Sequence, residues 1–328
     1  MSFQAEKALV RAYYDALAAA TPDSVDAVLG KYIADHWLWR GMHPFHEQIG
    51  APAVANAFWK PFLNAFHTVR RRQDVFMAGE NEIDGFQSVW VVSMGHLMVL
   101  FDRPFLNIPP TRKLTMIRYA EFNKIEHGKI TETAFFCDLL HLMRQAGLNP
   151  LPLQTGQHLI QPGPATHDGL LFDDADRNAG NATLALINRM INDINDHGAL
   201  TPQQELSRTW HDDMIWWGPE GIGATYGIDR YIEQHQKPFR TQIADRKFNG
   251  HICRLAEGDF GGFFGWPNLT VTPIGDYMGL PATHQPADMR VVDIYRRDGD
   301  KLAENWIFID MLHFLNQQGI DILKKIVP

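Results

Sequence analysis

Residues 117–147 of this chain, IRYAEFNKIEHGKITETAFFCDLLHLMRQAG, recur in similar form as residues 289–319, MRVVDIYRRDGDKLAENWIFIDMLHFLNQQG. Aligned without a gap, the two segments are identical at Arg118/Arg290, Lys129/Lys301, Glu132/Glu304, Phe136/Phe308, Asp138/Asp310, Leu140/Leu312, His141/His313, Gln145/Gln317 and Gly147/Gly319. Self-similarity at a fixed spacing indicates that one structural unit is used twice. The chain is therefore predicted to fold as two related units, and its function is to be sought in a unit of about half the chain.

The repeated segment has the pattern of a strand, a turn, a strand and a helix. The turns, at 127–129 and 298–301, contain glycine and are flanked by β-branched and aromatic residues, which is typical of a hairpin. The apolar residues that follow have helical spacing and end at a glycine. We expect Asp138 and Asp310 to cap these two helices by accepting backbone N–H groups. The alternative is that each forms an acid–base pair with the histidine three residues later.

The repeat extends toward the N-terminus, with matches at Trp39/Trp216, Gly41/Gly218, Gly50/Gly227 and the LysProPhe segments 60–62/237–239. The spacing there is 177 residues, against 172 for the segments above, so five residues are missing between the first and second strands of the second copy. In the first copy the pattern predicts helices at about 4–20, up to about 32 and at 53–66, a turn at 36–41, and strands near 69–78, 86–99, 114–124 and 130–137. The predicted order is three helices followed by a curled antiparallel sheet.

Residues 148–180 are rich in proline and glycine and have no periodicity, which is typical of a connection. We therefore predict a first domain at 1–147, a linker at 148–180 and a second domain at 181–328. A composition of 45% hydrophobic and 21% charged residues is typical of a well-packed globular protein. The two cysteines, Cys137 and Cys253, lie in apolar strand-like segments and are expected to be buried free thiols.

The net charge of −8 provides no basic surface for nucleic acid, and no apolar run has the length of a membrane span. The N-terminal residues begin a helical pattern without an apolar signal region, so a cytoplasmic location is expected. The segment 43–47, HisProPheHisGlu, lacks the helical histidine spacing of zinc motifs, so no metal is predicted. Nucleotide-binding and covalent nucleophile motifs are also missing from the sequence, and no cofactor is expected.

The order of two helices, a TrpXaaTrpXaaGly turn, a helix and a sheet that ends in a GlyLysIle hairpin resembles the SnoaL-like branch of the nuclear transport factor 2-like superfamily. Residues 309–319, IDMLHFLNQQG, are similar to the closing segment of the polyketide or ester cyclases of that branch. The resemblance covers both units. It implies an α+β fold of two tandem cone-shaped barrels, each a strongly curved antiparallel sheet wrapped by helices around an apolar pocket. Members of the superfamily include cyclases, isomerases, dehydratases, epoxide hydrolases and binding proteins.

Comparison with the ketosteroid isomerases of this superfamily suggests roles for individual residues. Their hydrogen-bond donor tyrosine corresponds to Tyr13, and their protonated acid corresponds to Glu121 in the first unit and Asp293 in the second. Their base lies in the loop before the third helix, where this chain has His43, His46, Glu47 and Glu220. The second unit has Met190 where the first has Tyr13, and this difference favours the first unit as the catalytic one.

Several of these residues also have a structural interpretation. Glu121 and Asp293 lie within apolar strands, so each is either a buried acid with a raised pKa or a residue on the solvent face. His96 and its counterpart Asn268 either orient a substrate oxygen or are polar groups satisfied in the core. The tryptophans predicted to contact substrate are Trp39, Trp59, Trp216 and Trp217. The remaining tryptophans are assigned to the core.

Together these features predict cofactor-independent acid–base catalysis on a hydrophobic, aromatic, oxygenated small molecule. Cyclase, isomerase, dehydratase and aldol-type lyase chemistry all fit this prediction. Two alternatives stay open: a non-catalytic binding protein, or one catalytic unit with one structural unit. We also expect the units to pair through their sheets as an intramolecular pseudo-dimer, with further homo-oligomerisation left open.

Overall fold

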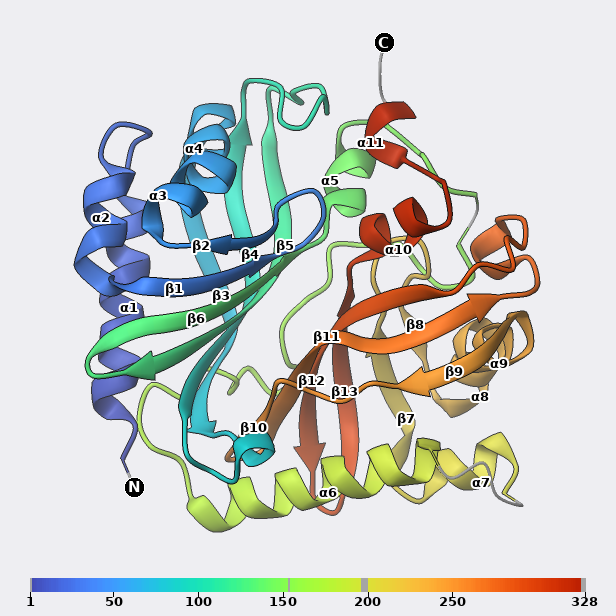
Figure 1. The fold of residues 1–328 in the computed structure, drawn as a ribbon. Coiled ribbons are helices and arrows are strands. Elements are labelled where there is room, and N and C mark those ends of the chain that lie inside the picture. Colours follow the sequence, from blue (N-terminus) through green and yellow to red (C-terminus); the bar gives the residue numbers. More distant parts are fainter. Residues whose placement is uncertain (1, 153, 196–199, 326–328) are drawn as a thin grey trace. The chain divides into compact units, whose positions relative to one another are not determined.

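The computed structural model describes residues 2–152, 154–195 and 200–325 and divides the chain into two compact units (Figure 1). Unit 1 comprises residues 1–150, 165–174 and 319–328, and unit 2 comprises residues 151–164 and 175–318. The proline- and glycine-rich connection is thus divided between the units, and the residues that follow the last repeated helix belong with unit 1.

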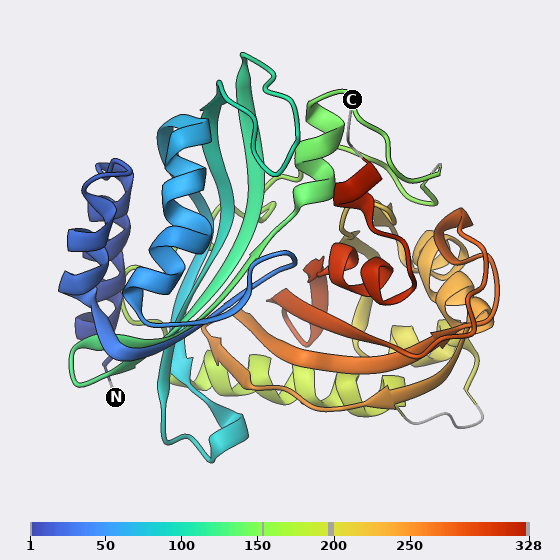
Figure 2. The same ribbon diagram turned by 45° about the horizontal axis from the view of Figure 1, so that its top comes forward.

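Unit 1 has a six-stranded sheet in the order β2-β1-β6-β5-β4-β3. Its elements are α1 (Gln4–Ala18), α2 (Val25–Tyr32), β1 (Ile33–Gly41), β2 (His46–Ile49), α3 (Ala51–Val54), the π-helical turn η1 (Ala55–Trp59), α4 (Lys60–Ala65), β3 (Phe66–Glu80), the 3₁₀ turn η2 (Glu82–Asp84), β4 (Val89–Phe101), β5 (Leu114–Glu126), β6 (Lys129–Cys137), α5 (Leu139–Gln145) and α11 (Ile322–Lys325). Figure 2 shows α1, α2 and α4 beside the curled sheet, and α1 packs against β3 and β4.

Unit 2 repeats this arrangement in the order β10-β11-β12-β13-β7-β8, with β9 also paired to β11. Its elements are α6 (Arg177–Asn195), α7 (Pro202–Ser207), β7 (Trp210–Trp217), β8 (Thr225–Tyr226), α8 (Ile228–Tyr231), the π-helical turn η3 (Ile232–Gln236), α9 (Lys237–Gln242), β9 (Ile243–Phe248), β10 (Cys253–Glu257), β11 (Phe260–Pro273), the 3₁₀ turn η4 (Tyr277–Gly279), β12 (Ala287–Asp298), β13 (Lys301–Ile309) and α10 (Met311–Gln317). Two α+β units with curled sheets confirm the predicted fold class.

The prediction of a turn at 36–41 was wrong, because these residues form the end of β1. Along β1, Trp37 and Trp39 are both buried, and the Trp37 Nε1–H donates a 2.9 Å hydrogen bond to Thr133 Oγ1 on β6. β1 pairs with β6 in parallel, and β7 pairs with β13 in the same way, whereas the other paired strands are antiparallel. Aromatic residues with period-two burial therefore extend each sheet by a strand.

Several local predictions are confirmed. Asp138 caps α5 and Asp310 caps α10, each accepting the backbone N–H of the histidine three residues later at 3.0 and 3.2 Å. Both cysteines are free and buried. The loop between the first two repeated strands runs from 81 to 88 in unit 1 and comprises only 258–259 in unit 2, where β11 also begins one residue earlier than its counterpart β4. This shorter loop accounts for the five missing residues.

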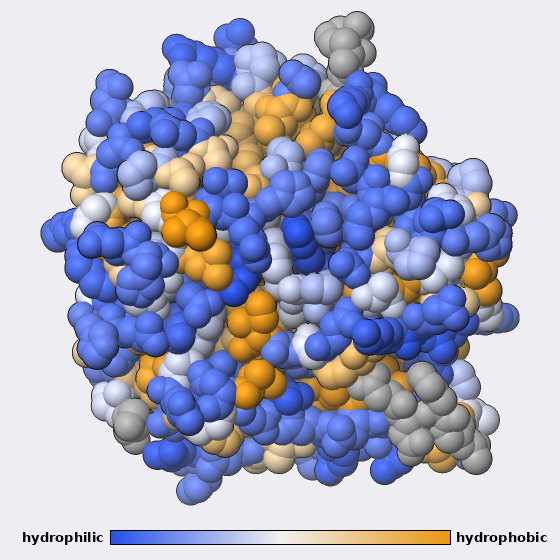
Figure 3. All heavy atoms as spheres, in the orientation of Figure 1, coloured by the Kyte–Doolittle hydropathy of each residue, from blue (hydrophilic) through white to orange (hydrophobic). Residues whose placement is uncertain are grey.

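Most of the face shown in Figure 3 is hydrophilic, with apolar areas scattered across it. Among the described residues, no helix combines the length and the apolar character needed to span a membrane.

Candidate active site

Unit 2 contains a cavity of about 190 Å³. Strands β9, β11, β12 and β13 and the helical segment 231–240 provide its walls. The lining residues are Ile194, Tyr231, His235, Gln236, Phe239, Arg240, Arg246, Phe248, Asn268, Leu269, Met289, Val291, Asp293, Ile307 and Ile309. The cavity is thus mainly apolar, with a small set of titratable groups, as is typical of small-molecule sites.

Asp293 is the acidic residue of this cavity. It lies on β12, where Met289, Val291 and Asp293 share one face because side chains alternate along a strand. The residue is 6% exposed, and burial raises the pKa of its carboxyl from 3.8 to about 7, although hydrogen bonds from Asn305 and Tyr295 act in the opposite direction. Asn305 Nδ2 donates to Asp293 Oδ1 at 3.0 Å and so holds the carboxyl in place.

The described residues contain no ion-pair partner for Asp293, and no arginine contributes to its pKa shift. A carboxyl in this state accepts or releases a proton close to neutral pH. The solvent-face alternative for this residue is therefore wrong.

Tyr231 and His235 face the same cavity from α8 and η3, one helical turn apart. His235 stacks on Trp216 with ring centroids 4.1 Å apart, and burial lowers the pKa of its imidazole to about 3. Its Nδ1 is buried and has no hydrogen-bond partner among the described residues. Burial, together with the charge of Asp293, raises the pKa of the Tyr231 hydroxyl. At neutral pH both side chains are uncharged polar groups directed at an apolar space.

Two cavity residues, Ile194 and Phe248, are 37% and 41% exposed. The cavity therefore reaches solvent beside α6 and the end of β9. Asn268, which was predicted to contact substrate, also lines the cavity from β11. Trp216 reaches the site only through its stack with His235, and it is 2% exposed.

The corresponding acid of unit 1, Glu121, has different surroundings. Its Oε2 lies 2.7 Å from Nη1 of Arg71, and the two side chains are 2% and 9% exposed. The Arg71 guanidinium carbon lies 3.7 Å from the ring centroid of Tyr14 and 4.4 Å from that of Tyr119. Burial lowers the pKa of Arg71, but Glu121, Tyr119 and Tyr14 together outweigh this effect, and the net shift is upward. Glu121 is therefore buried but paired with a cation.

A hydrogen-bond network extends this ion pair. Asn123 Nδ2 donates to the Tyr14 hydroxyl at 3.0 Å and to Glu121 Oε1 at 3.3 Å, and Asn123 Oδ1 accepts from Thr133 at 2.7 Å. Thr133 in turn accepts from Trp37. Interlocked side chains thus occupy the interior of unit 1 at the level of Glu121, as expected for buried polar groups that satisfy one another.

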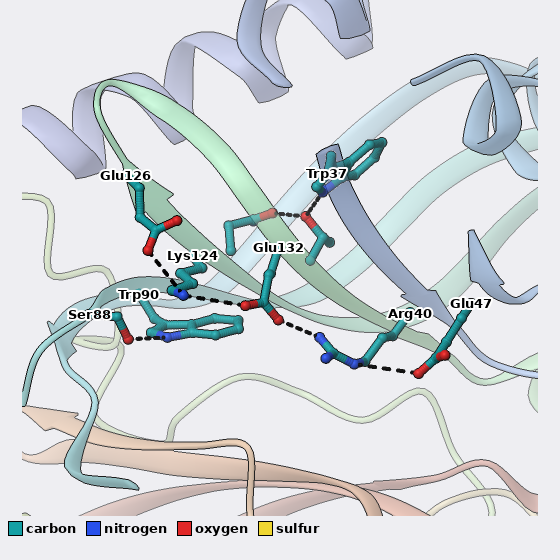
Figure 4. Close-up of polar contacts among 10 residues, drawn as sticks. Trp37, Arg40, Glu47, Ser88, Trp90, Lys124, Glu126 and Glu132 are labelled. Atoms are coloured by element: carbon teal, nitrogen blue, oxygen red, sulfur yellow. Dashed lines mark hydrogen bonds and ion pairs between the residues drawn. The ribbon is translucent and has the colours of Figure 1, made fainter. Parts of the chain in front are cut away.

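A second set of charges in unit 1 runs across strands β2, β1, β6 and β5 (Figure 4). Glu132 lies between Arg40 and Lys124, with N–O distances of 2.8 and 3.4 Å. Glu47 and Glu126 extend the row at its two ends. Glu47 Oε1 lies 3.8 Å from Arg40 Nε, and Glu126 Oε1 lies 3.1 Å from Lys124 Nζ. All these acids are paired, so this row is best explained as cross-strand stabilisation.

The other catalytic residues predicted in unit 1 are not among those that line the cavity of unit 2. Tyr13 is 1% exposed and packs against the rings of Tyr14 and Tyr32. His96 Nδ1 lies 3.5 Å from Asp74 Oδ2. The rings of His43 and His46 are 5.1 Å apart in the region between β1 and β2. These roles stay predictions.

Glu220 belongs to unit 2 but contacts residues of the connection. Its carboxylate accepts a hydrogen bond from Gln154 and pairs with His158. It is not one of the residues that line the described cavity.

The predicted tryptophans also separate into groups. Trp39 and Trp59 are 1% and 3% exposed and belong to an aromatic cluster with Phe58 and Phe135. Trp217 is half-buried at the end of β7. Within the described chain, no group of three or more His, Cys, Asp or Glu side chains is arranged to hold a metal ion.

The sequence interpretation missed Tyr231, His235 and Arg246. A signal for the first two was present, because aligning the LysProPhe segments places them opposite Val54 and Phe58 of unit 1. A polar aromatic residue that replaces an apolar core residue at two positions of one helical face indicates a pocket wall.

Residues 185–318 match the sequence model of a family described as SnoaL-like polyketide cyclase. This range covers α6 beyond its first turns through α10, and so includes Tyr231, His235 and Asp293. Unit 2 is a SnoaL-like domain. The SnoaL-like match does not extend to unit 1, although the two units share their strand order. No curated protein sequence matches the chain.

Solved structures with similarity to the chain include an NTF2-like protein from Burkholderia xenovorans LB400, at 12% identity and a TM-score of 0.34, which covers 42% of this chain and 97% of its own. Another is an NTF2-like protein from Burkholderia thailandensis E264, at 20% identity and a TM-score of 0.32, which covers 44% of this chain and 97% of its own. TsrD from Streptomyces laurentii has 18% identity and a TM-score of 0.33, and covers 45% of this chain and 99% of its own.

Proposed function

We propose that the SnoaL-like unit is a cofactor-independent acid–base enzyme that acts on a hydrophobic, oxygenated aromatic small molecule, with Asp293 as the residue that transfers the proton. One observation carries the proposal: a buried carboxyl with a pKa of about 7 lines an apolar cavity. General acid–base catalysis is most effective when the pKa of the catalytic group lies near the working pH.

In the proposed reaction, the Asp293 carboxylate removes a proton from a carbon next to a substrate carbonyl, and the electron pair moves onto the carbonyl oxygen. Tyr231 and His235 line the same cavity and are uncharged at neutral pH, so they are the proposed partners of the developing oxyanion. Asn305 keeps the carboxyl oriented through its 3.0 Å hydrogen bond. The enolate then attacks a second carbonyl, is reprotonated elsewhere, or expels a leaving group, which correspond to cyclase or aldol, isomerase and dehydratase outcomes.

The size of the cavity narrows the range of substrates. Its volume of about 190 Å³ lies below the roughly 300–1,000 Å³ that is usual for sites of drug-sized ligands. We therefore favour a substrate whose buried portion is of the order of two fused rings.

Deuterium exchange tests the common first step without knowledge of the final product. The protein is incubated in D₂O with 2-tetralone, a flat bicyclic ketone with acidic C–H bonds, and mass spectrometry follows the exchange. We expect wild-type protein to accelerate exchange over buffer and Asp293→Asn to lose about 10²–10⁴-fold of that acceleration. The matched control is Asp288→Asn on the same strand, whose carboxylate accepts from Thr270 instead of lining the cavity. Equal rates in wild type and Asp293→Asn would contradict the proposal.

We further propose that unit 1 is the non-catalytic partner, in contrast to the sequence-based preference for it. The observation that favours this assignment is the paired state of Glu121, whose carboxylate is held by Arg71 within a hydrogen-bond network. If unit 1 were a second active site, Asp293→Asn would retain a substantial part of the exchange activity.

A further inference from the structure

The cavity of the SnoaL-like unit contains an arginine without a carboxylate partner. Arg246 lies on β9, lines the cavity and is half-buried. Its Nη1 donates to the backbone carbonyl oxygens of Arg240 and Ile243, at 3.2 and 3.4 Å. No ion pair to Arg246 occurs within residues 2–152, 154–195 and 200–325, so the carbonyl groups hold the guanidinium without neutralising its charge.

The other cavity arginine, Arg240, provides a direct contrast. Its Nη2 lies 2.6 Å from Oε1 of Glu205, which is 6% exposed and also accepts a hydrogen bond from Gln236. The charge of Arg240 is therefore balanced within the protein. Burial, followed by repulsion from Arg240, lowers the pKa of Arg246, as expected for a cation that lacks a counter-charge.

Arg246 and Asp293 lie toward opposite ends of the cavity. Phe248, Leu269 and Met289 form one row across β9, β11 and β12. Asp293 is four residues beyond Met289 along β12, which is about 13 Å of strand. Arg246 precedes Phe248 by two residues on β9, which runs in the same direction as β12, and so it lies on the other side of the row. This separation is consistent with the missing contribution of any arginine to the Asp293 pKa.

We propose that the substrate of unit 2 carries a carboxylate that binds Arg246, while its apolar ring system occupies the cavity between Arg246 and Asp293. A guanidinium fork pairs with a planar carboxylate through two parallel hydrogen bonds, and burial strengthens this pairing. The assignment rests on the proposed function only in placing the reacting carbon at Asp293. Carboxylate binding at Arg246 is independent of any turnover.

The test compares the binding of 2-naphthoate with that of its uncharged isostere 2-naphthamide to the full chain by isothermal titration calorimetry. Wild-type protein should bind the carboxylate at least about tenfold more tightly. Arg246→Met should remove that preference and leave naphthamide affinity within about twofold, and Arg246→Lys should restore part of it. The matched control is Lys247→Met, which removes the same charge from an exposed neighbouring residue that does not line the cavity, and should change neither affinity.

Equal affinity of wild type for the two compounds would overturn the inference. The inference would also be overturned if Arg246→Met weakened the affinity for both compounds equally, because the residue would then only support the fold. Asp293→Asn separates this inference from the proposed function, since it should abolish deuterium exchange but keep the preference for naphthoate. If wild-type protein prefers naphthoate but does not accelerate deuterium exchange, only the catalytic proposal is refuted. If it accelerates deuterium exchange but binds the two compounds equally, only the carboxylate site is refuted.

Discussion

Unit 1 and unit 2 place an acidic residue at the same position of the same strand, and the surroundings of the two carboxyls differ. Glu121 on β5 is held 2.7 Å from Arg71, whereas Asp293 on β12 lies beside a cavity with its pKa raised to about 7. Two carboxyls at equivalent backbone positions thus differ in their neighbours, since one is paired with a cation and the other is not. The equivalent strands therefore place an acid at the same position in both units, and residues on other strands decide whether that acid has a cationic partner.

The decisive neighbour can be identified from strand register. Arg71 lies opposite Leu97 in unit 1, and Phe248 lies opposite Leu269 in unit 2. The two leucines are separated by the repeat spacing of 172 residues and the two β3/β9 residues by 177, so Arg71 and Phe248 are equivalent. Unit 1 therefore has a cation at the position where unit 2 has an apolar residue at the cavity opening.

The helix that faces the sheet shows a second difference. Phe58 in unit 1 packs against Trp39, Phe62 and Phe135, whereas its counterpart in unit 2 is His235. Both residues lie in a π-helical turn, so this irregular turn belongs to the scaffold and is not specific to one function.

Arg71→Phe would place in unit 1 the residue type that unit 2 has at the equivalent position, Phe248. Glu121 would then be buried without its cation. We expect a loss of about 3–5 kcal/mol in the free energy of unfolding at pH 8, because an uncompensated buried charge is costly. Urea unfolding followed by circular dichroism measures this loss. The double variant Arg71→Phe/Glu121→Gln should recover part of it; no recovery would indicate that Arg71 stabilises unit 1 through its aromatic stacking instead.

The pH dependence of stability should differ between wild type and Asp293→Asn. Because the pKa of Asp293 is raised in the folded state, its protonated form is favoured by folding, and stability falls as pH rises from about 4 to 7. A shift of about three pH units corresponds to about 4 kcal/mol. Unfolding curves at several pH values should show the variant gaining stability relative to wild type up to pH 7 and little beyond it. A constant difference across this range would mean that Asp293 has an ordinary pKa.

Phe248→Arg is the reverse exchange and would bring a cation toward Asp293. We expect the pKa of Asp293 to fall by about one unit, since an opposite charge in the same cavity favours the carboxylate. The pH profile of deuterium exchange reports this shift directly, with Phe248→Leu as the size-reducing control that keeps the site uncharged. An unchanged profile would show that an arginine at this position does not reach the acid in unit 2.

The smallest expected effect concerns a feature that the units share. Asp138→Ala and Asp310→Ala should each cost about 0.5–2 kcal/mol of unfolding free energy, because each removes an N-cap hydrogen bond. Thermal unfolding of the two variants provides the measurement. Each aspartate also interacts with the repeated arginine, Asp310 Oδ2 with Arg290 Nη1 at 3.3 Å and Asp138 with the charge of Arg118, so both replacements should fall in the upper half of that range. Loss of exchange activity in Asp310→Ala without loss of stability would favour the catalytic alternative for this residue.

The local sequence pattern was sufficient to predict much of the fold. Hairpin turns, caps and the strand that carries Asp293 depend on residues close in sequence, and these predictions agree with the structure. The segment 36–41 was misread as a turn, because its strand forms through parallel pairing with residues about 95 positions away. Non-local pairing of this kind leaves only a weak trace in local sequence.

The sequence alone determined the duplication, the α+β class and the two acidic strand positions, because repeat spacing and side-chain periodicity are properties of the chain itself. Only the tertiary structure decided which acid is paired, since Arg71 and Glu121 are fifty positions apart and meet through β4. It also brought Tyr231, Arg246 and Asp293 to one cavity from three separate elements. A pKa depends on solvent exclusion and on charges within a few ångströms, and folding sets both.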